Sequence, residues 1–310
     1  MRAADPAPPG SRFRIRVPAT SANLGSGFDA LGLALDLWDT YTVEVTAGPA
    51  PCAVAVHGEG VGSVSADEAN LVVATMRAAA AAAGATLPPF SLRCDNAVPH
   101  GLGLGSSAAA IVGGVLAGRV LAGLARDPDA ELALAARLEG HPDNVAAALL
   151  GGLTVAWWAA PGPDADVSTG GAARAVSAGT GSARAVSAGT GSARGVTVRP
   201  VGVLVRLWVP PAAMSTTVAR GLLAASVSHA DAAHAAGRTA LLVAALTGAT
   251  TPAGHAAGEV LGDVGEADRL RVGGGRGTPA APDRSALLLA ATEDRLHQDA
   301  RGPEIGRAHV

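Results

Sequence analysis

The feature that most constrains this chain is a glycine-rich segment that runs into small residues, PHGLGLGSSAAA at positions 99–110. Backbone N–H groups can converge on phosphate oxygens only where no Cβ blocks the approach, and glycine alone lacks a Cβ. A helix that starts directly after the loop adds its N-terminal dipole and its free N–H groups. Ser106 and Ser107 stand where their hydroxyls can contact phosphate or ligate magnesium. The segment is therefore a candidate phosphate loop.

The same segment allows other interpretations. A dinucleotide-binding GxGxxG pattern requires a third glycine where Ser106 stands, and no acidic ribose partner follows a second strand at a suitable distance. A Walker A loop requires a Lys before its Ser or Thr, and this segment contains no Lys. A glycine-rich turn into a close-packed helix, with no ligand at all, stays open on the glycines alone.

Composition limits the classes of function. A chain of 310 residues suits one large domain or two ordinary ones, and with 3% aromatic residues its core must consist mainly of Ala, Val and Leu. A formal net charge of −3 and scattered basic residues argue against nucleic-acid binding. Cys52 and Cys94 are too few for a disulfide framework or a thiolate zinc site. Without a secretory h-region or a long apolar span, we expect a cytoplasmic protein with no membrane segment.

Local patterns predict mixed structure in the first half. Residues 12–46 alternate as strands do, and a helix with an acidic first turn and a Gly stop is expected over about 68–84. FSLRCDNAV is a predicted strand that enters the glycine-rich segment, and a small-residue helix follows it. Helices are also predicted at DPDAELALAARLEG, where Asp127 or Asp129 is the cap candidate, and at HPDNVAAALLGG. LTVAWW then continues as a strand.

The second half is interrupted twice. RAVSAGTGSA occurs twice in tandem, and residues 161–196 are interpreted as a low-complexity surface insertion with little to bury. A loop insertion rich in Gly, Pro and Asp follows at about 249–284. A strand pair is predicted at VTVRPVGVLVRLWVP, with helices at STTVARGLL, SHADAAHAAGRTALLVAALTG and SALLLAATEDRLHQ. Strands followed by helices in each half indicate an α+β protein with two domains, 1–160 and 197–310.

Three motifs in order give the sequence a specific resemblance. PHGLGLGSSAA is similar to the second motif of the GHMP kinases, and VPATSANLGSGFDALGLAL at 17–35 resembles their first motif. EGHPDNVAAALLGG at 139–152 and the STTVAR segment resemble the branch that phosphorylates homoserine. The resemblance implies a ribosomal-protein-S5-like N-terminal domain that binds ATP and a ferredoxin-like C-terminal domain. It also implies ATP and L-homoserine as substrates and Mg²⁺ as the metal, and it leaves a homodimer open.

The resemblance further implies roles for individual residues. The residues expected to bind ATP are Pro99, Gly101, Gly103, Leu104, Gly105, Ser106, Ser107 and Ala108. Glu139 resembles the magnesium-ligating glutamate of the family, with Ser107 as a second ligand. The expected substrate contacts are Asn23, Asp29, Asn144, Thr216, Arg220 and Arg301. Asp29 suits the ammonium group of an amino acid, and Arg220 suits its carboxylate.

Asn144 determines the chemistry that the resemblance implies. Mevalonate kinase and similar enzymes place an Asp near the acceptor hydroxyl, whereas this sequence resembles the homoserine branch in having Asn144. An amide cannot take a proton, so Asn144 and Glu139 are expected to act by positioning and charge stabilisation during direct in-line transfer. His141 is expected to be structural, and Asp143 to support the loop or cap a helix. A kinase for another alcohol, such as mevalonate or shikimate, and an inactive remnant are the alternatives.

The end of the sequence departs from the family that it resembles. No third glycine-rich motif of the GAGPS or GAGPT type occurs, and residues 305–310, IGRAHV, can be encoded by a string that resembles a common sequencing adapter. We therefore expect an incomplete C-terminal domain and a gene that continues beyond Val310. A chain expressed as written is expected to fold poorly or to have weak activity, because sheet edges and buried surface would be exposed.

Overall fold

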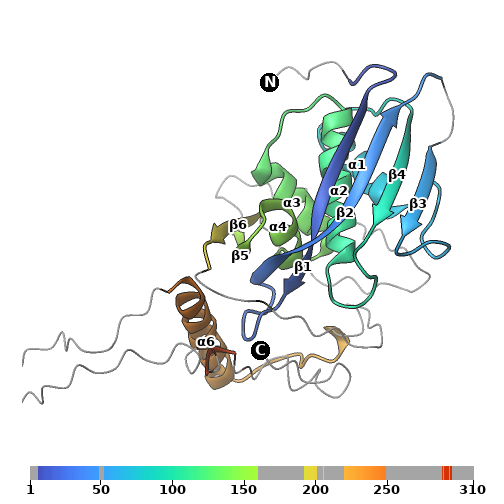
Figure 1. Ribbon diagram of the computed structural model, residues 1–310. Coiled ribbons are helices and arrows are strands. Elements are labelled where there is room, and N and C mark those ends of the chain that lie inside the picture. Colours follow the sequence, from blue (N-terminus) through green and yellow to red (C-terminus); the bar gives the residue numbers. More distant parts are fainter. Residues whose placement is uncertain are drawn as a thin grey trace, which may run out of the picture.

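The computed structural model describes residues 6–48, 52–159, 192–200, 205, 220–248, 288, 290–292 and 294 (Figure 1). The strands are β1 (Arg12–Ala22), β2 (Leu31–Val45), β3 (Ala53–Gly58), β4 (Phe90–Asn96), β5 (Leu153–Ala159) and β6 (Ser192–Val198). The helices are α1 (Leu71–Ala82), α2 (Ser106–Leu121), α3 (Pro128–Glu139), α4 (Asp143–Leu150) and α6 (His229–Thr247). This mixture confirms the predicted α+β class.

All six strands join one sheet with the order β3-β4-β2-β5-β6, and β1 pairs with β2 beside this path. The long strand β2 is its centre, because it pairs antiparallel with β1, with β4 through residues 40–45 and with β5 through residues 31–33. Only the β3–β4 pair is parallel among these strands. The predicted alternation is confirmed in β1, where Arg12, Arg14 and Arg16 face outward between inward-facing apolar residues.

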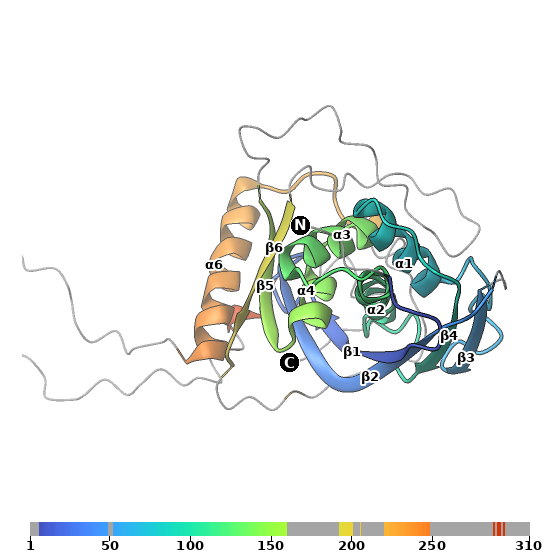
Figure 2. The same ribbon diagram turned by 90° about the horizontal axis from the view of Figure 1, so that it is seen from above.

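Helices α1 to α4 cover one face of the sheet, and α2 runs through the middle of this layer (Figure 2). Their small side chains build the main core with the inner residues of β1, β2 and β4, as the composition predicts. The core members on α2 include Ala108, Ala109, Val112, Val115 and Leu121. Helix α6 lies on the other side of β5 and β6 (Figure 2), where its Leu242 packs with Leu31.

The start of α1 corrects one prediction. The helix begins at Leu71 and not near residue 68, because Asn70 is its N-cap and accepts a hydrogen bond from the N–H of Val72 at 3.0 Å. The preceding Asp67 instead accepts from Ser65 Oγ and from the Ala69 N–H, so no acidic residue lies in the first turn. The predicted cap of α3 is confirmed, since Asp127 accepts from the Ala130 N–H at 3.1 Å.

Strand β6 overlaps the end of the predicted insertion at 161–196. It pairs antiparallel with β5 from Leu153↔Val198 to Ala159↔Ser192, so residues 192–196 belong to the sheet. The tandem repeat, the second insertion, the strand predicted after residue 200 and the final residues 305–310 lie outside the described residues, apart from Val205. Within the part of the chain that is described, no helix is long and apolar enough to cross a membrane.

Glycines allow α1 and α2 to pack closely. A Cβ at Gly118 would lie 2.4 Å from the carbonyl oxygen of Met76 and 2.8 Å from its Cα. These are backbone atoms, so the contact cannot be relieved by rotating a side chain. On α6, by contrast, a Cβ at Gly237 would meet no atom within 4 Å.

Gly118→Ala is therefore expected to lower the free energy of unfolding by about 1–3 kcal/mol, because the two helices must move apart. Gly237→Ala is the matched control and is expected to stabilise by up to about 1 kcal/mol, since alanine favours helix and meets no obstacle. Urea unfolding followed by circular dichroism measures both changes. Equal effects of the two substitutions would show that the α1–α2 contact is not closely packed.

Candidate functional site

The predicted phosphate loop has the geometry of an anion cradle. Gly101, Gly103 and Gly105 all have left-handed backbone conformations, with φ of 72°, 75° and 72°. Helix α2 begins immediately afterwards at Ser106, and its N-cap, Gly105, provides no side-chain hydrogen bond to the first turn. The N–H groups at this helix start are thus left for another acceptor, which suits phosphate oxygens. The prediction of a helix directly after the loop is confirmed.

The entrance to the loop is held by a buried acidic residue that the sequence reading did not identify. Asp39 of β2 accepts hydrogen bonds from the N–H groups of Ala97 and Val98, at 2.7 and 2.9 Å, and from the Tyr41 hydroxyl at 3.2 Å. Burial raises the pKa of the Asp39 carboxyl, which these hydrogen bonds partly oppose. The available signal was an acidic residue in the inward-facing set of β2, in phase with Tyr41 and Val43.

The exit from the loop is held by β1. The Thr20 N–H donates to the Leu104 carbonyl oxygen at 2.9 Å, and the Thr20 hydroxyl donates to Asn144 Oδ1 at 2.8 Å. A Cβ at Gly105 would lie 2.0 Å from the Thr20 hydroxyl oxygen, so glycine is required there for close approach as well as for its positive φ. Asn144, on the first turn of α4, is in this way brought next to the loop.

The two residues predicted to ligate magnesium do meet. Ser107 on α2 donates its hydroxyl to Glu139 Oε2 at 2.9 Å, so both oxygens lie at the end of the phosphate loop. The pKa of Glu139 is raised by burial, although His141 and Ser107 oppose the rise. A carboxylate and a hydroxyl are hard oxygen donors of the kind that Mg²⁺ binds, so this pair fits the metal that the fold family implies.

His141 connects this pair to a second acidic group. Its Nδ1 lies 2.5 Å from Asp143 Oδ1 and its Nε2 lies 3.9 Å from Glu139 Oε1. Burial alone lowers the pKa of His141, but the hydrogen bond and charge of Asp143, together with Glu139, raise it overall. The imidazolium form is therefore favoured between two carboxylates. Asp143 also accepts the Asn144 N–H at 2.8 Å, but it is the first residue of α4 and not its N-cap, which is Pro142.

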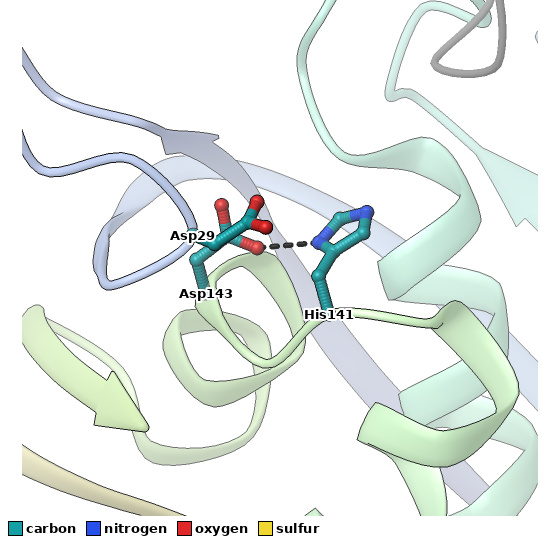
Figure 3. Close-up of side chains that lie close together, drawn as sticks. All are labelled: Asp29, His141 and Asp143. Carbon is teal, nitrogen blue, oxygen red and sulfur yellow. Dashed lines mark hydrogen bonds and ion pairs between the residues drawn. The ribbon is translucent and has the colours of Figure 1, made fainter. Parts of the chain in front are cut away.

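Figure 3 shows how Asp29, His141 and Asp143 converge. One ligand-type atom from each lies within 4.8 Å of the others. Asp143 is fully buried, and its Oδ2 has no hydrogen-bond partner among the described residues. An unpaired buried carboxylate oxygen is costly, so this point of the site favours a cationic or hydrogen-bond-donating group.

Arg220 closes the far side of the site. Its guanidinium forms two hydrogen bonds with Asp29, at 3.1 Å to Oδ2 and 2.5 Å to Oδ1, and lies over the Phe28 ring, 5.5 Å from its centroid. The sequence predicted that these two charges hold opposite ends of an amino acid, and the structure places them side by side. Each member of this pair could exchange its partner for an oppositely charged group of a ligand.

The loop that carries Asp29 is held in an uncommon backbone conformation. Asn23 and Asp29 are the described non-glycine residues with positive φ, 58° and 54°. The side chain of Asn23 supports the turn, because its Oδ1 accepts the Asp29 N–H at 2.9 Å. Such conformations concentrate at ligand sites, where surrounding contacts maintain them. Asn23, Asp29, Ser107, Glu139, Asn144 and Arg220 thus surround one region, whereas Thr216 and Arg301 lie outside the described residues.

The chain is similar in sequence to known proteins. Residues 70–152, which contain the phosphate loop and Glu139, match the family described as GHMP kinases N terminal domain. The chain is 42% identical to a homoserine kinase from Clavibacter michiganensis subsp. michiganensis over 294 residues, which is 94% of this chain and 72% of that protein. It is 40% identical to a homoserine kinase from Streptomyces coelicolor, covering 97% of this chain and 77% of that one.

A solved structure shows the same fold. The crystal structure of homoserine kinase from Cytophaga hutchinsonii matches 94% of this chain and 74% of its own, with a TM-score of 0.62 at 21% sequence identity. The fold is that of a solved homoserine kinase, and residues 70–152 match the N-terminal domain of the GHMP kinases. At the identities and coverage found, the chain belongs to the homoserine kinase family.

Asp39→Ala is expected to destabilise the protein by about 2 kcal/mol or more, because it leaves two backbone N–H groups without an acceptor beside a buried Val98. Asp39→Asn retains an acceptor oxygen and is the matched control, with a smaller expected loss. Urea unfolding at neutral pH measures both. If the two variants lose the same stability, the hydrogen bonds from Ala97 and Val98 do not hold the loop entrance.

Proposed function

We propose that this protein transfers the γ-phosphoryl group of ATP to the side-chain hydroxyl of L-homoserine, giving O-phospho-L-homoserine and ADP in threonine biosynthesis. The observation that carries the proposal is a row of polar side chains from the start of α2 to Arg220, in which each side chain has a polar atom within 4.8 Å of the next. It runs through Ser107, Glu139, His141, Asp143, Asp29 and Arg220. Such a row provides a phosphate end, a metal position and an amino-acid end in one site.

The ATP phosphates would lie on the loop from Pro99 to Ala108. Its left-handed glycines and the start of α2 offer backbone N–H groups, and no side chain caps them within the helix. The side chains of Leu104 and Ala108 are buried, so these two residues would contact the phosphates through their backbone and not through their side chains. Ser107 and Glu139 would hold Mg²⁺, which supplies charge neutralisation for the transferred group.

L-Homoserine would bind by exchange of charge partners. Its ammonium group would lie between Asp29 and the free Oδ2 of Asp143, and its carboxylate would pair with Arg220. Asn23 and Asn144 would then approach the hydroxyl-bearing end. A zwitterion restores a partner to both members of the Asp29–Arg220 pair, whereas a singly charged alcohol leaves one of them unmatched. This argument favours an amino acid over mevalonate or shikimate.

The transfer itself would be direct. The homoserine hydroxyl oxygen bonds to the γ-phosphorus as the bond from that phosphorus to the β,γ-bridging oxygen breaks, and ADP leaves with the bridging oxygen's electron pair. The hydroxyl proton leaves to a phosphoryl oxygen and then to solvent, since an amide at Asn144 cannot accept it. The protein contributes alignment and charge stabilisation. We also place the reaction in the cytoplasm.

Glu139→Gln is expected to lower kcat on the order of a hundredfold, because it removes a negative oxygen donor from the proposed metal position. Glu44→Gln, on the exposed face of β2, is the matched control and should leave kcat unchanged. A coupled assay of ADP release with homoserine, ATP and a series of Mg²⁺ concentrations measures both. Full activity of Glu139→Gln at limiting Mg²⁺ would remove Glu139 from the metal site.

Arg220→Met is expected to raise the KM for homoserine by about tenfold or more while leaving the KM for ATP unchanged, since a charge-assisted pair with the substrate carboxylate is lost. Arg16→Met is the control, because Arg16 lies exposed over Trp38 on the outer face of the sheet. The same ADP-release assay with homoserine, mevalonate and shikimate compares the acceptors. A preference for mevalonate or shikimate would refute the proposed substrate.

A further inference from the structure

Thr20 forms hydrogen bonds with both the phosphate loop and Asn144. It lies in β1, is 0% exposed and contacts the loop twice, by the hydrogen bond from its N–H to Leu104 and by the closeness of its hydroxyl to Gly105. Its hydroxyl then donates to Asn144 Oδ1 at 2.8 Å. No motif role was expected of Thr20, and its neighbour Asn23 in the same segment was the predicted substrate contact.

The local backbone explains how Thr20 reaches Asn144. The register between β1 and β2 shifts between Pro18 and Thr20, from Pro18↔Trp38 to Thr20↔Ala34. Such an irregularity bends a strand and re-aims the side chains that follow it, often beside a functional site. At the irregularity itself, Ala19 packs with Val98 and Leu104 in a small apolar cluster, which fixes the backbone next to Thr20. Thr20 is therefore held by the packing of Ala19 and by its own hydrogen bonds to Leu104 and Asn144.

The direction of the hydrogen bond decides what Asn144 can do. A hydroxyl has one proton, and this one is donated to the amide oxygen of Asn144. With its Oδ1 engaged by Thr20, Asn144 offers its NH₂ group to the remaining space, and NH₂ is a donor only. Next to the hydroxyl of the substrate, this NH₂ group would donate a hydrogen bond to one lone pair of the hydroxyl oxygen. The other lone pair would stay free to attack phosphorus.

We propose that Thr20 is a positioning residue for phosphoryl transfer: it fixes the Asn144 amide so that its NH₂ group orients the acceptor hydroxyl toward the γ-phosphate. The proposal rests on the proposed function, because it takes Asn144 as the contact of the homoserine hydroxyl. The proposal adds that Thr20, which also contacts the phosphate loop, orients Asn144. One residue would thus align the phosphoryl donor, ATP, with the phosphoryl acceptor, homoserine.

Thr20→Val removes the hydroxyl and keeps the branched shape, whereas Thr20→Ser keeps the hydroxyl and removes the methyl group. Thr20→Val is expected to lower kcat with homoserine about tenfold, because a misoriented reacting group costs rate rather than ATP binding. The KM for ATP should change less than about twofold. Thr20→Ser should restore most of kcat. Thr20→Ala carries the same test if the valine variant does not fold, since it creates no steric contact.

A double-mutant cycle separates positioning from mere structural support. In an Asn144→Ala background, Thr20→Val is expected to have almost no further effect on kcat, because the amide through which it acts is absent. An equal fold-loss of kcat in both backgrounds, or a loss that follows the thermal midpoint and the KM for ATP, would overturn the proposal. If the wild-type protein phosphorylates homoserine and the two substitutions are additive, only the role of Thr20 fails. If the wild-type protein does not phosphorylate homoserine, the proposed function fails and this inference with it.

Discussion

The attachment of the phosphate loop to the sheet at both of its ends is the constraint on which the site depends. A loop with three glycines in left-handed conformations has little stiffness of its own, because glycine allows many backbone states. Asp39 accepts two N–H groups where the chain enters the loop, and the Thr20 N–H binds the Leu104 carbonyl oxygen where it leaves. Both anchors come from the adjacent strands β1 and β2. Hydrogen bonds to the sheet therefore fix the two ends of the glycine-rich loop.

The fold could be predicted from the sequence where its signals are local. The two strands within residues 12–46, the Asp127 cap and the glycine-to-helix transition at Ser106 each depend on neighbours in the chain, and each is confirmed, although burial alternates strictly only in the first half of β1. The start of α1 was misplaced because acidic residues before a helix resemble those in its first turn, and only the Asn70 cap distinguishes them. The family motifs led to Ser107, Glu139 and Asn144, which lie together in the site. The roles of Asp39 and Thr20 depend on partners 58 and 124 residues away, so a local pattern can mark Asp39 as an inward-facing acid but cannot identify the partners of either residue.

The site holds several charged side chains that are removed from water, and each of them needs a partner. Glu139 and Asp143 flank His141, whose protonation they favour, and Arg220 neutralises Asp29. Pairing offsets part of the cost of desolvating these charges, but the Oδ2 of Asp143 has no hydrogen-bond partner among the residues described. A protein retains such an atom where a ligand completes it. This unpaired oxygen is one reason why we propose that the cationic group of the ligand binds beside Asp143.

An amide at position 144 is consistent with catalysis only if its orientation is fixed. A carboxylate in its place could accept a proton from either oxygen, so its rotation would matter little, whereas an amide has one donor side and one acceptor side. A freely rotating amide would present its oxygen as often as its NH₂, and only one of these orients the hydroxyl for attack. The Thr20 hydroxyl removes this ambiguity at the cost of a single hydrogen bond to Oδ1. In the mechanism that we propose, an amide in place of a general base requires a second residue to hold it, and Thr20 of β1, the strand that also binds the phosphate loop, would be that residue.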